Sequence, residues 1–439
     1  MKKWLAFIVT VLMLVSMSAC GKKDNDLTIT FWMTPVMKEE SSMQGFIDAF
    51  ERENPGIRVE LAYQTWEGIA NKLQIALSTG DTPDVYLDGA ARTAMLPSLG
   101  VLVPVDDIMA SFDDWYPAVL SFGKLNGTHY LVPASQMGAS FLSVNVTLAK
   151  ELGVYDLLPE DRKSWNIQDF YAFCKAATEA GKAGDIKGTM LYAGSSTSDD
   201  ILYSLMMSNG GTIIDFETNT CTANSPACVE VIEILGNIVK EGYCLDGATI
   251  QTGSDTGTPF YNQQYVAILN SNAPAILQEF EKMKAEGYID AVPEIRTYGV
   301  PTGEGCETVS ACWGANGIAI FKNQDEAKIT AAKKFVTFLM EQKAFTETVW
   351  QEQPNYYPSR NNGAEFISDS PMVKEEVIFR QELTNECADY DFGILESYWS
   401  EVRSCFYPEL QSVFSGEKTA QQAMDDFAAN VNRILADQK

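Results

Sequence analysis

Residues 27–88 hold three short apolar runs separated by two amphipathic segments, and this order constrains the fold more than any other part of the chain. Each apolar run is rich in β-branched and aromatic residues, which favours strands. The segments between the runs place apolar side chains at helical spacing. Strand, helix, strand, helix, strand predicts parallel strands joined by right-handed crossovers, and therefore an open α/β sheet. The expected strands are Leu27–Trp32, Ile57–Tyr63 and Asp84–Leu87.

The carboxyl ends of these three strands are expected to lie along one edge of the sheet, because parallel strands all end on the same side. Ligands of open α/β sheets bind beyond that edge. Residues 32–34, 63–66 and 88–90 occupy it and supply aromatic rings, amides and one carboxylate. We therefore expect a small polar ligand at this edge.

Helix starts are predicted where a side chain can accept a hydrogen bond from the first turn. Thr65 precedes an amphipathic segment and is expected to cap it. Ser41 with Gln44, and Thr419 with Gln422, have the spacing of a capping box. Helices are therefore expected to begin directly after Ser41, Thr65 and Thr419.

The motifs of this region resemble those of a known family. Phe50 is followed by "NPGIRVE" and then by "NKLQIALSTGDTPDV". This run resembles the helix, Pro-Gly turn, strand, helix and Pro-Asp-Val strand of bacterial extracellular solute-binding proteins that serve sugar transporters, maltodextrin-binding proteins among them. The later segments "LGVLVPVDDIM" and "FSGEKTAQQAMDDFAANVNRIL" extend the resemblance to Leu435. It implies an α/β, two-lobed periplasmic-binding-protein fold of type II, in which each lobe is a mainly parallel sheet flanked by helices, with multiple hinge crossovers.

A chain of 439 residues is too long for one compact core, which agrees with two lobes. The resemblance implies that each lobe is built from segments distant in sequence. The expected parts are residues 27–131 with 300–350 for lobe 1, residues 135–296 with 357–439 for lobe 2, and hinges near 131–135, 296–301 and 350–357.

The first 26 residues have the pattern of an export and anchoring signal. Residues 1–19 start with "MKK" and continue with an apolar run too short to span a bilayer comfortably, which is typical of a signal peptide. The motif "MSAC" at residues 17–20 resembles a bacterial lipobox, which implies cleavage before Cys20, acylation of that cysteine and a tether over residues 20–26. An ordinary signal peptide with a chance cysteine is the alternative. The lipobox predicts an extracytoplasmic lipoprotein held at the bacterial cell membrane by its lipid anchor only.

Composition excludes several other kinds of site. The chain has 59 acidic and 32 basic residues, so nucleic acid is not an expected partner. It has one histidine, His129, so a His-rich metal site is excluded and a histidine-based triad would have to use this residue. Adjacent acidic pairs such as Asp199-Asp200 are expected to be solvated helix starts and not a general acid and base. We expect no metal and no other cofactor.

Eight cysteines remain besides Cys20. Their spacing suggests pairing of Cys221 with Cys228 and of Cys306 with Cys312, since disulfides are allowed outside the cytoplasm. Free buried thiols are the alternative, and the spacing does not decide between them.

A sugar site needs aromatic rings for the flat C–H faces of the ligand and polar side chains for its hydroxyl groups. Position at a strand end or in an irregular passage between the lobes selects the candidates. Trp313, in "ACWGANGIAIF", is the strongest of them because an aromatic residue there commonly faces the cleft in the resembled family. The predicted ligand-binding residues are Trp32, Trp66, Asp88, Arg92, Gln136, Asn270, Trp313, Tyr356, Tyr357, Arg360 and Trp399.

The resemblance implies a substrate-binding lipoprotein of an ABC importer. Such a protein captures a sugar or oligosaccharide by hinge closure and delivers it to permease subunits in the membrane, and we expect it to act as a monomer without catalytic residues. Two alternatives remain open. A secreted glycoside hydrolase would also combine aromatic residues with carboxylates, and the acidic surface would suit a binding protein for a non-sugar ligand such as a polyamine.

Overall fold

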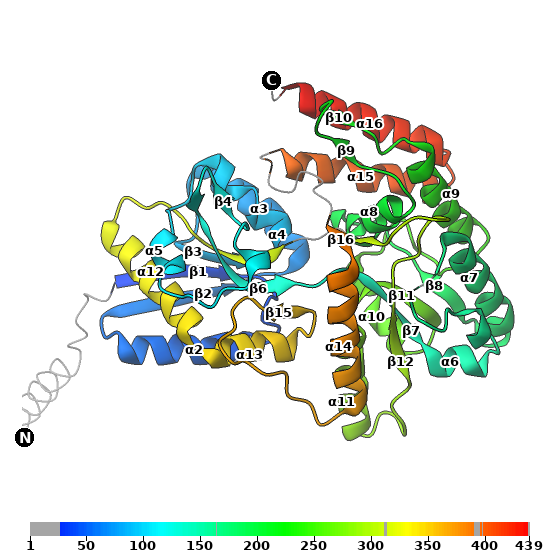
Figure 1. Ribbon diagram of the computed structural model, residues 1–439, viewed down its shortest axis with the longest axis horizontal. Helices are drawn as coiled ribbons and strands as arrows, with labels where there is room; N and C mark the ends of the chain where they lie inside the picture. Colours follow the sequence, from blue (N-terminus) through cyan, green and yellow to red (C-terminus); the bar gives the residue numbers. More distant parts are fainter. Residues whose placement is uncertain (1–26, 164, 311–313, 390–395, 397, 438–439) are drawn as a thin grey trace, which may run out of the picture.

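The computed structural model describes residues 27–163, 165–310, 314–389, 396 and 398–437. The described chain forms two lobes, each with a central β-sheet and helices on its faces (Figure 1). This confirms the two-lobed α/β fold that the sequence predicts.

The first lobe is built on a six-stranded sheet. Its strands are β1 (Leu27–Met33), β2 (Ile57–Tyr63), β3 (Val85–Asp88), β6 (Leu131–Met137), β14 (Ala315–Ile320) and β15 (Tyr356–Pro358), in the order β15-β6-β14-β3-β1-β2. β1 pairs in parallel with both β2 and β3, which confirms the predicted parallel unit. β14 lies between β3 and β6 and runs antiparallel to both, and β15 runs antiparallel to β6. The sheet is therefore mixed and not mainly parallel, because β6, β14 and β15 belong to segments that leave for the other lobe or return from it.

Helices cover both faces of this sheet. Ile29, Phe31 and Met33 alternate along β1 and are buried on the face covered by α2, α12 and α13, whereas Trp32 between them packs toward the opposite face. Phe31 lies edge-on to Phe335 of α12, with ring centroids 5.3 Å apart. The period of two in a strand thus separates the two cores of this lobe. The helices of the first lobe are α2 (Glu40–Glu53), α3 (Trp66–Thr79), α4 (Ala90–Thr93), α5 (Asp106–Met109), α12 (Glu326–Glu341) and α13 (Lys343–Glu352).

The second lobe is built on a four-stranded sheet of β7 (Phe141–Asn145), β8 (Lys187–Met190), β11 (Tyr265–Ser271) and β12 (Ile295–Tyr298), in the order β12-β7-β11-β8. β11 is parallel to β8 and antiparallel to β7, and β12 is antiparallel to β7, so this sheet is mixed as well. The buried Trp165 lies edge-on to Phe170, Phe173 and Tyr298. The helices are α6 (Val146–Glu151), α7 (Ile167–Gly181), α8 (Asp199–Ser208), α9 (Pro226–Lys240), α10 (Gly257–Tyr261), α11 (Ala273–Ala285), α14 (Pro371–Glu386), α15 (Trp399–Phe414) and α16 (Ala420–Asp437).

Besides the two sheets and the α-helices, the described chain contains three two-stranded ribbons and six short 3-10 helices. The ribbons are β4 (Lys124–Leu125) with β5 (Thr128–His129), β9 (Ile214–Asp215) with β10 (Thr220–Cys221), and β13 (Val309–Ser310) with β16 (Ala388–Asp389).

The chain passes between the two sheets three times: at residues 138–140 after β6, between β12 and β14 (described for residues 299–310), and at residues 359–370 after β15. The first passage follows β6, which remains in the first sheet as far as Met137. It therefore lies after the expected position near 131–135, because Pro133 stands inside a paired strand and does not end it. The third passage likewise follows β15 and lies after the expected 350–357. α14, which begins after this passage, stands between the two lobes (Figure 1).

The cysteines of the described chain are free thiols. Cys221 and Cys228 are both buried and unbonded, so their suggested pairing is wrong. Burial raises the pKa of the Cys221 thiol to about 12, which leaves it protonated and unreactive at neutral pH. Cys306 is also free, and Cys312 lies outside the described residues.

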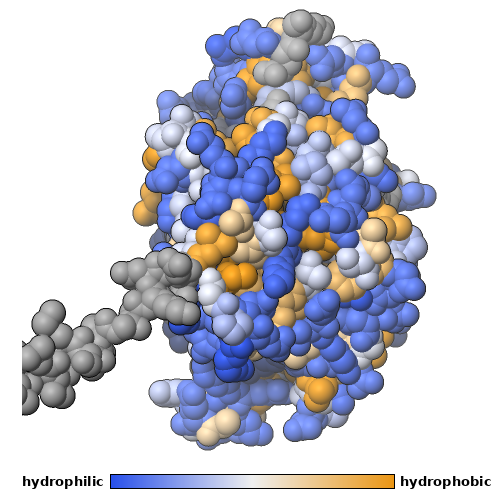
Figure 2. Space-filling model, turned by 90° about the vertical axis from the view of Figure 1, so that its left-hand side faces the viewer, coloured by the Kyte–Doolittle hydropathy of each residue, from blue (hydrophilic) through white to orange (hydrophobic). Residues whose placement is uncertain are grey.

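The outer surface of the first lobe is mostly hydrophilic (Figure 2). This agrees with the formal net charge of −27. Among the described residues, none of the helices combines the length and apolar character needed to cross a bilayer.

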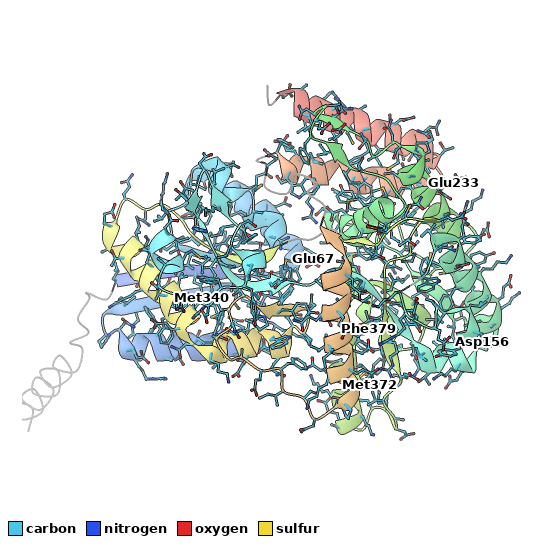
Figure 3. All side chains as sticks on the ribbon, viewed as in Figure 1. Glu67, Asp156, Glu233, Met340, Met372 and Phe379 are labelled. Carbon is cyan, nitrogen blue, oxygen red and sulfur yellow. The ribbon has the colours of Figure 1, made fainter. Side chains whose placement is uncertain are left out.

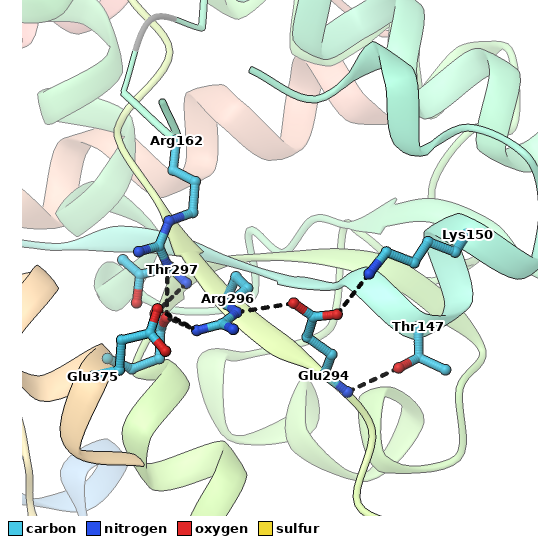
Figure 4. A network of polar contacts seen from close by, with 8 residues as sticks. Thr147, Lys150, Arg162, Glu294, Arg296, Thr297 and Glu375 are labelled. Atoms are coloured by element: carbon cyan, nitrogen blue, oxygen red, sulfur yellow. Dashed lines mark hydrogen bonds and ion pairs between the residues drawn. The ribbon is translucent and has the colours of Figure 1, made fainter. Parts of the chain in front are cut away.

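A polar network joins α6, β12 and α14 in the second lobe (Figure 4). Glu294 accepts from Lys150 Nζ at 2.7 Å and from Arg296 Nε at 3.1 Å. Partial burial raises the pKa of Glu294, but Lys150 and Arg296 together lower it by more, so its pKa lies below the ordinary value of 4.5. Glu294 therefore contributes stability above about pH 4.5 that is lost as the pH falls through its folded-state pKa.

We expect Glu294→Gln to lower the free energy of unfolding at pH 7 by on the order of 1 kcal/mol, a modest value because Glu294 is one-third exposed. The difference from the unaltered chain is expected to shrink as the pH falls below 4.5. Urea unfolding at pH 7 and at pH 3.5 measures both. Glu233→Gln on α9 is the control, because Glu233 is exposed and forms no ion pair among the described residues (Figure 3). An equal loss in the two variants would contradict the assigned role of the Glu294 ion pairs.

Candidate functional site

A cavity of about 420 Å³ lies between the two lobes. The first lobe contributes residues that follow β2 and β3, among them Trp66 and Arg92. The second lobe contributes Tyr192 and the end of β11, including Asn270. Met137 at the end of β6 and the first passage between the lobes, residues 138–140, also line it. The segments after β2 and β3 thus line the cavity, whereas residues 32–34 at the end of β1 do not.

The two lobes contact each other directly beside this cavity. Ser254, in the loop before α10, donates a hydrogen bond to Glu67 on α3. Glu67 lies on the side of the first lobe that faces α14 (Figure 3). In a second contact, Asn272 Nδ2, directly before α11, donates to Asn355 Oδ1, directly before β15, at 2.8 Å. All four side chains line the cavity, so its walls are joined across the gap between the lobes.

Asp88 is fully buried behind the cavity wall and organises the loop after β3. Its carboxylate accepts from Thr34 Oγ1 at 2.7 Å and from the Gly89 amide at 2.7 Å. It also accepts from the Tyr86 hydroxyl and forms a two-point ion pair with Arg92, in which the Nη2–Oδ1 distance is 2.6 Å. Asp88 does not line the cavity, whereas Arg92 does. Asp88 therefore positions a cation that faces the ligand space.

Arg92 in turn lies over the ring of Trp66, with its guanidinium carbon 5.2 Å from the ring centroid. Burial lowers the pKa of Arg92, but the Asp88 carboxylate raises it more strongly, so Arg92 stays charged. Burial and the charge of Asp88 together hold the pKa of Tyr86 well above its usual range. Asp88, Arg92 and Trp66 thus form one chain of contacts that ends with an aromatic ring on the cavity wall.

The second lobe carries a similar buried pair. Arg403 of α15 lines the cavity and pairs with Asp199, the first residue of α8, with an Nη2–Oδ1 distance of 2.6 Å. Burial raises the pKa of Asp199, and the Arg403 charge offsets part of that rise. Asp199 is fully buried, so the expectation that it is solvated is wrong. The Asp199-Asp200 pair is a helix start, but its first carboxylate faces an arginine two hundred residues away in sequence.

A third arginine, Arg380 of α14, lines the cavity and is 2% exposed. Its Nη1 donates to the Ser271 carbonyl at 2.8 Å and its Nη2 to the Ala139 carbonyl at 3.2 Å. The guanidinium carbon lies 5.2 Å from the centroid of the Phe141 ring. Neither Arg380 nor Arg403 is among the predicted site residues, because nothing in the periodicity of their helices distinguishes a cavity-facing arginine from a surface one.

Four of the predicted ligand-binding residues line the cavity. Trp66, Arg92 and Asn270 stand on its walls, and Tyr356 lies beside them at the start of β15. Asn270 has a positive φ of 48° at the strand end, which aims the following residues toward α11. Ligand contact by these four residues stays a prediction.

Six other predicted residues do not line the cavity, and neighbouring side chains engage several of them. Lys72 Nζ lies 4.0 Å from the centroid of the Trp32 ring. Arg360 pairs with Asp114 at 2.6 Å in the first lobe, and Trp399 is fully buried against Tyr203. Trp313 and Cys20 lie outside the described residues. The six residues off the wall are Trp32, Asp88, Gln136, Tyr357, Arg360 and Trp399.

Within the part of the chain that the structure describes, no group of three or more histidine, cysteine, aspartate or glutamate side chains could hold a metal ion. His129 lies in the β4–β5 hairpin, where its Nδ1 is 2.9 Å from an oxygen of Asp106, away from the cavity.

Comparison with known proteins identifies the family. The model for bacterial extracellular solute-binding proteins matches residues 45–381. The sn-glycerol-3-phosphate-binding periplasmic protein UgpB of Escherichia coli O1:K1 / APEC is 22% identical over 423 residues, which cover 93% of this chain and 92% of that protein. UgpB of Salmonella typhimurium (strain LT2) is 21% identical and covers 96% of this chain and 95% of its own.

Solved structures give the same result for the fold. The GacH receptor of Streptomyces glaucescens, solved without ligand and with acarbose, superposes with a TM-score of 0.75 at 19% identity and covers 94% of this chain and 99% of its own. Maltose-bound MalE3 of T. maritima has a TM-score of 0.74 at 18% identity, covering 92% of this chain and 99% of its own. UgpB is a periplasmic binding protein, and the two solved structures are of proteins that bind acarbose or maltose. The match over residues 45–381 shows that this chain belongs to the bacterial extracellular solute-binding proteins.

Proposed function

We propose that this chain is the substrate-binding lipoprotein of an ABC importer, which captures a sugar or oligosaccharide and presents it to permease subunits in the membrane. The observation that carries the proposal is a cavity walled by both lobes, in which aromatic residues stand beside amide, hydroxyl and guanidinium groups. Its volume of about 420 Å³ lies within the range of about 300–1,000 Å³ that small-molecule sites occupy. The relatives bind maltose, acarbose or sn-glycerol-3-phosphate, which supports a small polyhydroxylated ligand.

Hinge closure is the proposed mechanism. The proposed hinge segments are the three passages that join the lobes, which the structure describes at residues 138–140, 299–310 and 359–370. A ligand that touches both walls binds the closed arrangement more tightly than the open one and so shifts the population toward it. Reversing an open bias of 99:1 requires a preference of roughly ten-thousand-fold. The closed form, with Glu67 and Ser254 in contact, is then what the permease recognises.

Anchoring through acylated Cys20 is proposed from the lipobox motif alone. The motif at residues 17–20 is followed by a polar tether, and the described structure begins at Leu27. Several acyl chains on one cysteine hold a protein durably at a membrane, whereas one chain does not. We propose that the protein acts there as a monomer.

The geometry favours binding over hydrolysis. Glycoside hydrolases use two carboxyl groups that flank the scissile bond. Glu67 is the only carboxylate among the described residues on the cavity wall, and it already accepts a hydrogen bond from Ser254. Arg380, the one wall arginine without a carboxylate partner among the described residues, also disfavours a polyamine, since it would repel that ligand.

A panel of sugars tested by thermal shift examines the proposal, because a ligand that binds only the folded chain raises the melting temperature. We expect at least one sugar to raise it in the unaltered chain. Trp66→Ala is expected to weaken binding of that sugar on the order of tenfold, through loss of aromatic contact area. Trp32→Ala is the matched control, because Trp32 does not line the cavity. A weaker effect for Trp66 than for Trp32 would place the sugar elsewhere.

A further inference from the structure

Arg380 is a buried cation without a carboxylate partner among the described residues. Its side chain is 2% exposed, its Nε has no hydrogen-bond partner, and no acidic group of the described chain lies within 4.0 Å of it. Two backbone carbonyls accept from its Nη atoms, which leaves part of the guanidinium unsatisfied beside the cavity. A charge buried in this way is costly unless something pairs with it.

The acidic residues near Arg380 are already engaged by other cations (Figure 4). Glu376, one turn before Arg380 on α14, is fully buried and accepts from Arg162 at 2.6 Å and from Arg296 at 3.1 Å. Glu375 pairs with Arg296 at 2.8 Å. Lys150 and the two arginines therefore balance Glu294 and these two glutamates, three charges against three. Arg380 is one positive charge in excess of this network.

The other two arginines on the cavity wall differ from Arg380 in this respect. Arg92 forms a two-point ion pair with Asp88, and Arg403 forms one with Asp199. The pairing satisfies both buried charges inside the protein. A guanidinium with free N–H groups matches a planar or tetrahedral anion, which can accept two of its hydrogen bonds at once.

From this excess charge we propose that the natural ligand is a sugar derivative carrying an anionic group, a carboxylate or a phosphate, and that Arg380 binds that group. The inference rests on the proposed function for the sugar part of the ligand. Ligand binding then supplies the missing counter-ion, in a chain whose formal net charge of −27 would otherwise repel an anion at long range. Among the described residues, Arg380 is therefore the one place in the cavity at which the anionic group of the ligand would be attracted.

The test compares neutral sugars with acidic derivatives of the same sugars by calorimetric titration of the full chain. Glucose, galactose and maltose are the neutral ligands, glucuronate and galacturonate are the carboxylates, and glucose 6-phosphate is the phosphate. We expect at least one acidic derivative to bind tenfold or more tightly than its neutral parent. This comparison in the unaltered chain does not depend on the folding of any variant.

Arg380→Gln is expected to remove that tenfold preference of an acidic derivative over its neutral parent, and Arg380→Lys is expected to retain part of the preference because it keeps the charge. Arg433→Gln, an exposed position on α16, is the matched control and is expected to change neither affinity. Equal weakening of neutral and acidic ligands in Arg380→Gln would overturn the inference and leave the proposed sugar binding intact. A different outcome is that no sugar binds, whereas glycerol 3-phosphate binds to the unaltered chain and not to Arg380→Gln. That result would support the anion site at Arg380 and contradict the proposal that the ligand is a sugar.

Discussion

Replacing Asp88 with alanine is expected to lower the free energy of unfolding by about 3–5 kcal/mol, the range found when one partner of a buried ion pair is removed. The substitution leaves Arg92 as an unpaired charge behind Trp66, and it leaves the Thr34 hydroxyl and the Gly89 amide without their acceptor. Because Arg92 then no longer has a fixed position on the cavity wall, the affinity for the ligand is expected to fall tenfold or more. Urea unfolding and ligand titration measure the two effects separately.

Two further variants sharpen the Asp88 experiment. Asp88→Asn keeps an acceptor for Thr34 and Gly89 but removes the charge, so an intermediate loss of stability is expected. Asp81→Ala, at an exposed loop position of the same lobe, is expected to change stability by less than about 0.5 kcal/mol. If Asp88→Ala lost ligand affinity with no loss of stability, Asp88 would act on the ligand directly, and the role assigned to its ion pair would be incorrect.

Gly138→Val is expected to be strongly destabilising, by about 3 kcal/mol, because it forces atoms into a closely packed passage between the lobes. A Cβ atom at this position would lie 2.9 Å from the Asn355 carbonyl oxygen and 2.9 Å from a ring carbon of Tyr357. The Gly138 amide also donates to that same carbonyl at 2.8 Å, so the backbone cannot withdraw without losing the bond. Since Asn355 and Tyr356 line the cavity, ligand affinity is expected to fall together with stability.

Gly45→Ala provides the contrasting measurement. Gly45 lies inside α2, and a Cβ atom there would meet nothing within 4 Å. Alanine at a mid-helix position is expected to stabilise by about 0.5–1 kcal/mol relative to glycine. Thermal unfolding of the two variants should therefore shift in opposite directions. A Gly138→Val chain as stable as the unaltered one would show that the passage can move aside freely.

Local patterns in the sequence were sufficient to predict the parallel core of the first lobe. The alternation in Ile57–Tyr63 and the helical spacing after Thr65 depend on neighbouring residues only, and both elements form as expected. Thr65 accepts from the Gly68 amide at 3.4 Å, and Thr419 and Gln422 form the predicted reciprocal capping bonds.

Features that depend on distant residues could not be predicted in this way. The predicted capping box at Ser41 is wrong: α2 begins at Glu40, and the Glu39 amide donates at 2.9 Å to Glu352 of α13, more than three hundred residues away. The same holds for the site, where Arg380 and Arg403 reach the cavity only because α14 and α15 pack onto the second lobe. Six predicted residues do not line the cavity. The position of a residue at a strand end predicts which edge of the sheet it lies at, but it does not predict which way its side chain points.

The position of β14 has a consequence for the order in which the protein can assemble. This strand separates β3 from β6 and is hydrogen-bonded to both, yet it enters the sequence only at Ala315. In a polypeptide that ends before Ala315, β14 is missing, and β3 and β6 each lack the strand that pairs with them. The N-terminal half therefore cannot complete its own sheet as it is synthesised. Assembly of the first lobe must therefore wait for a strand that is made after all four strands of the second sheet, and a truncated chain would leave two unsatisfied strand edges open to aggregation.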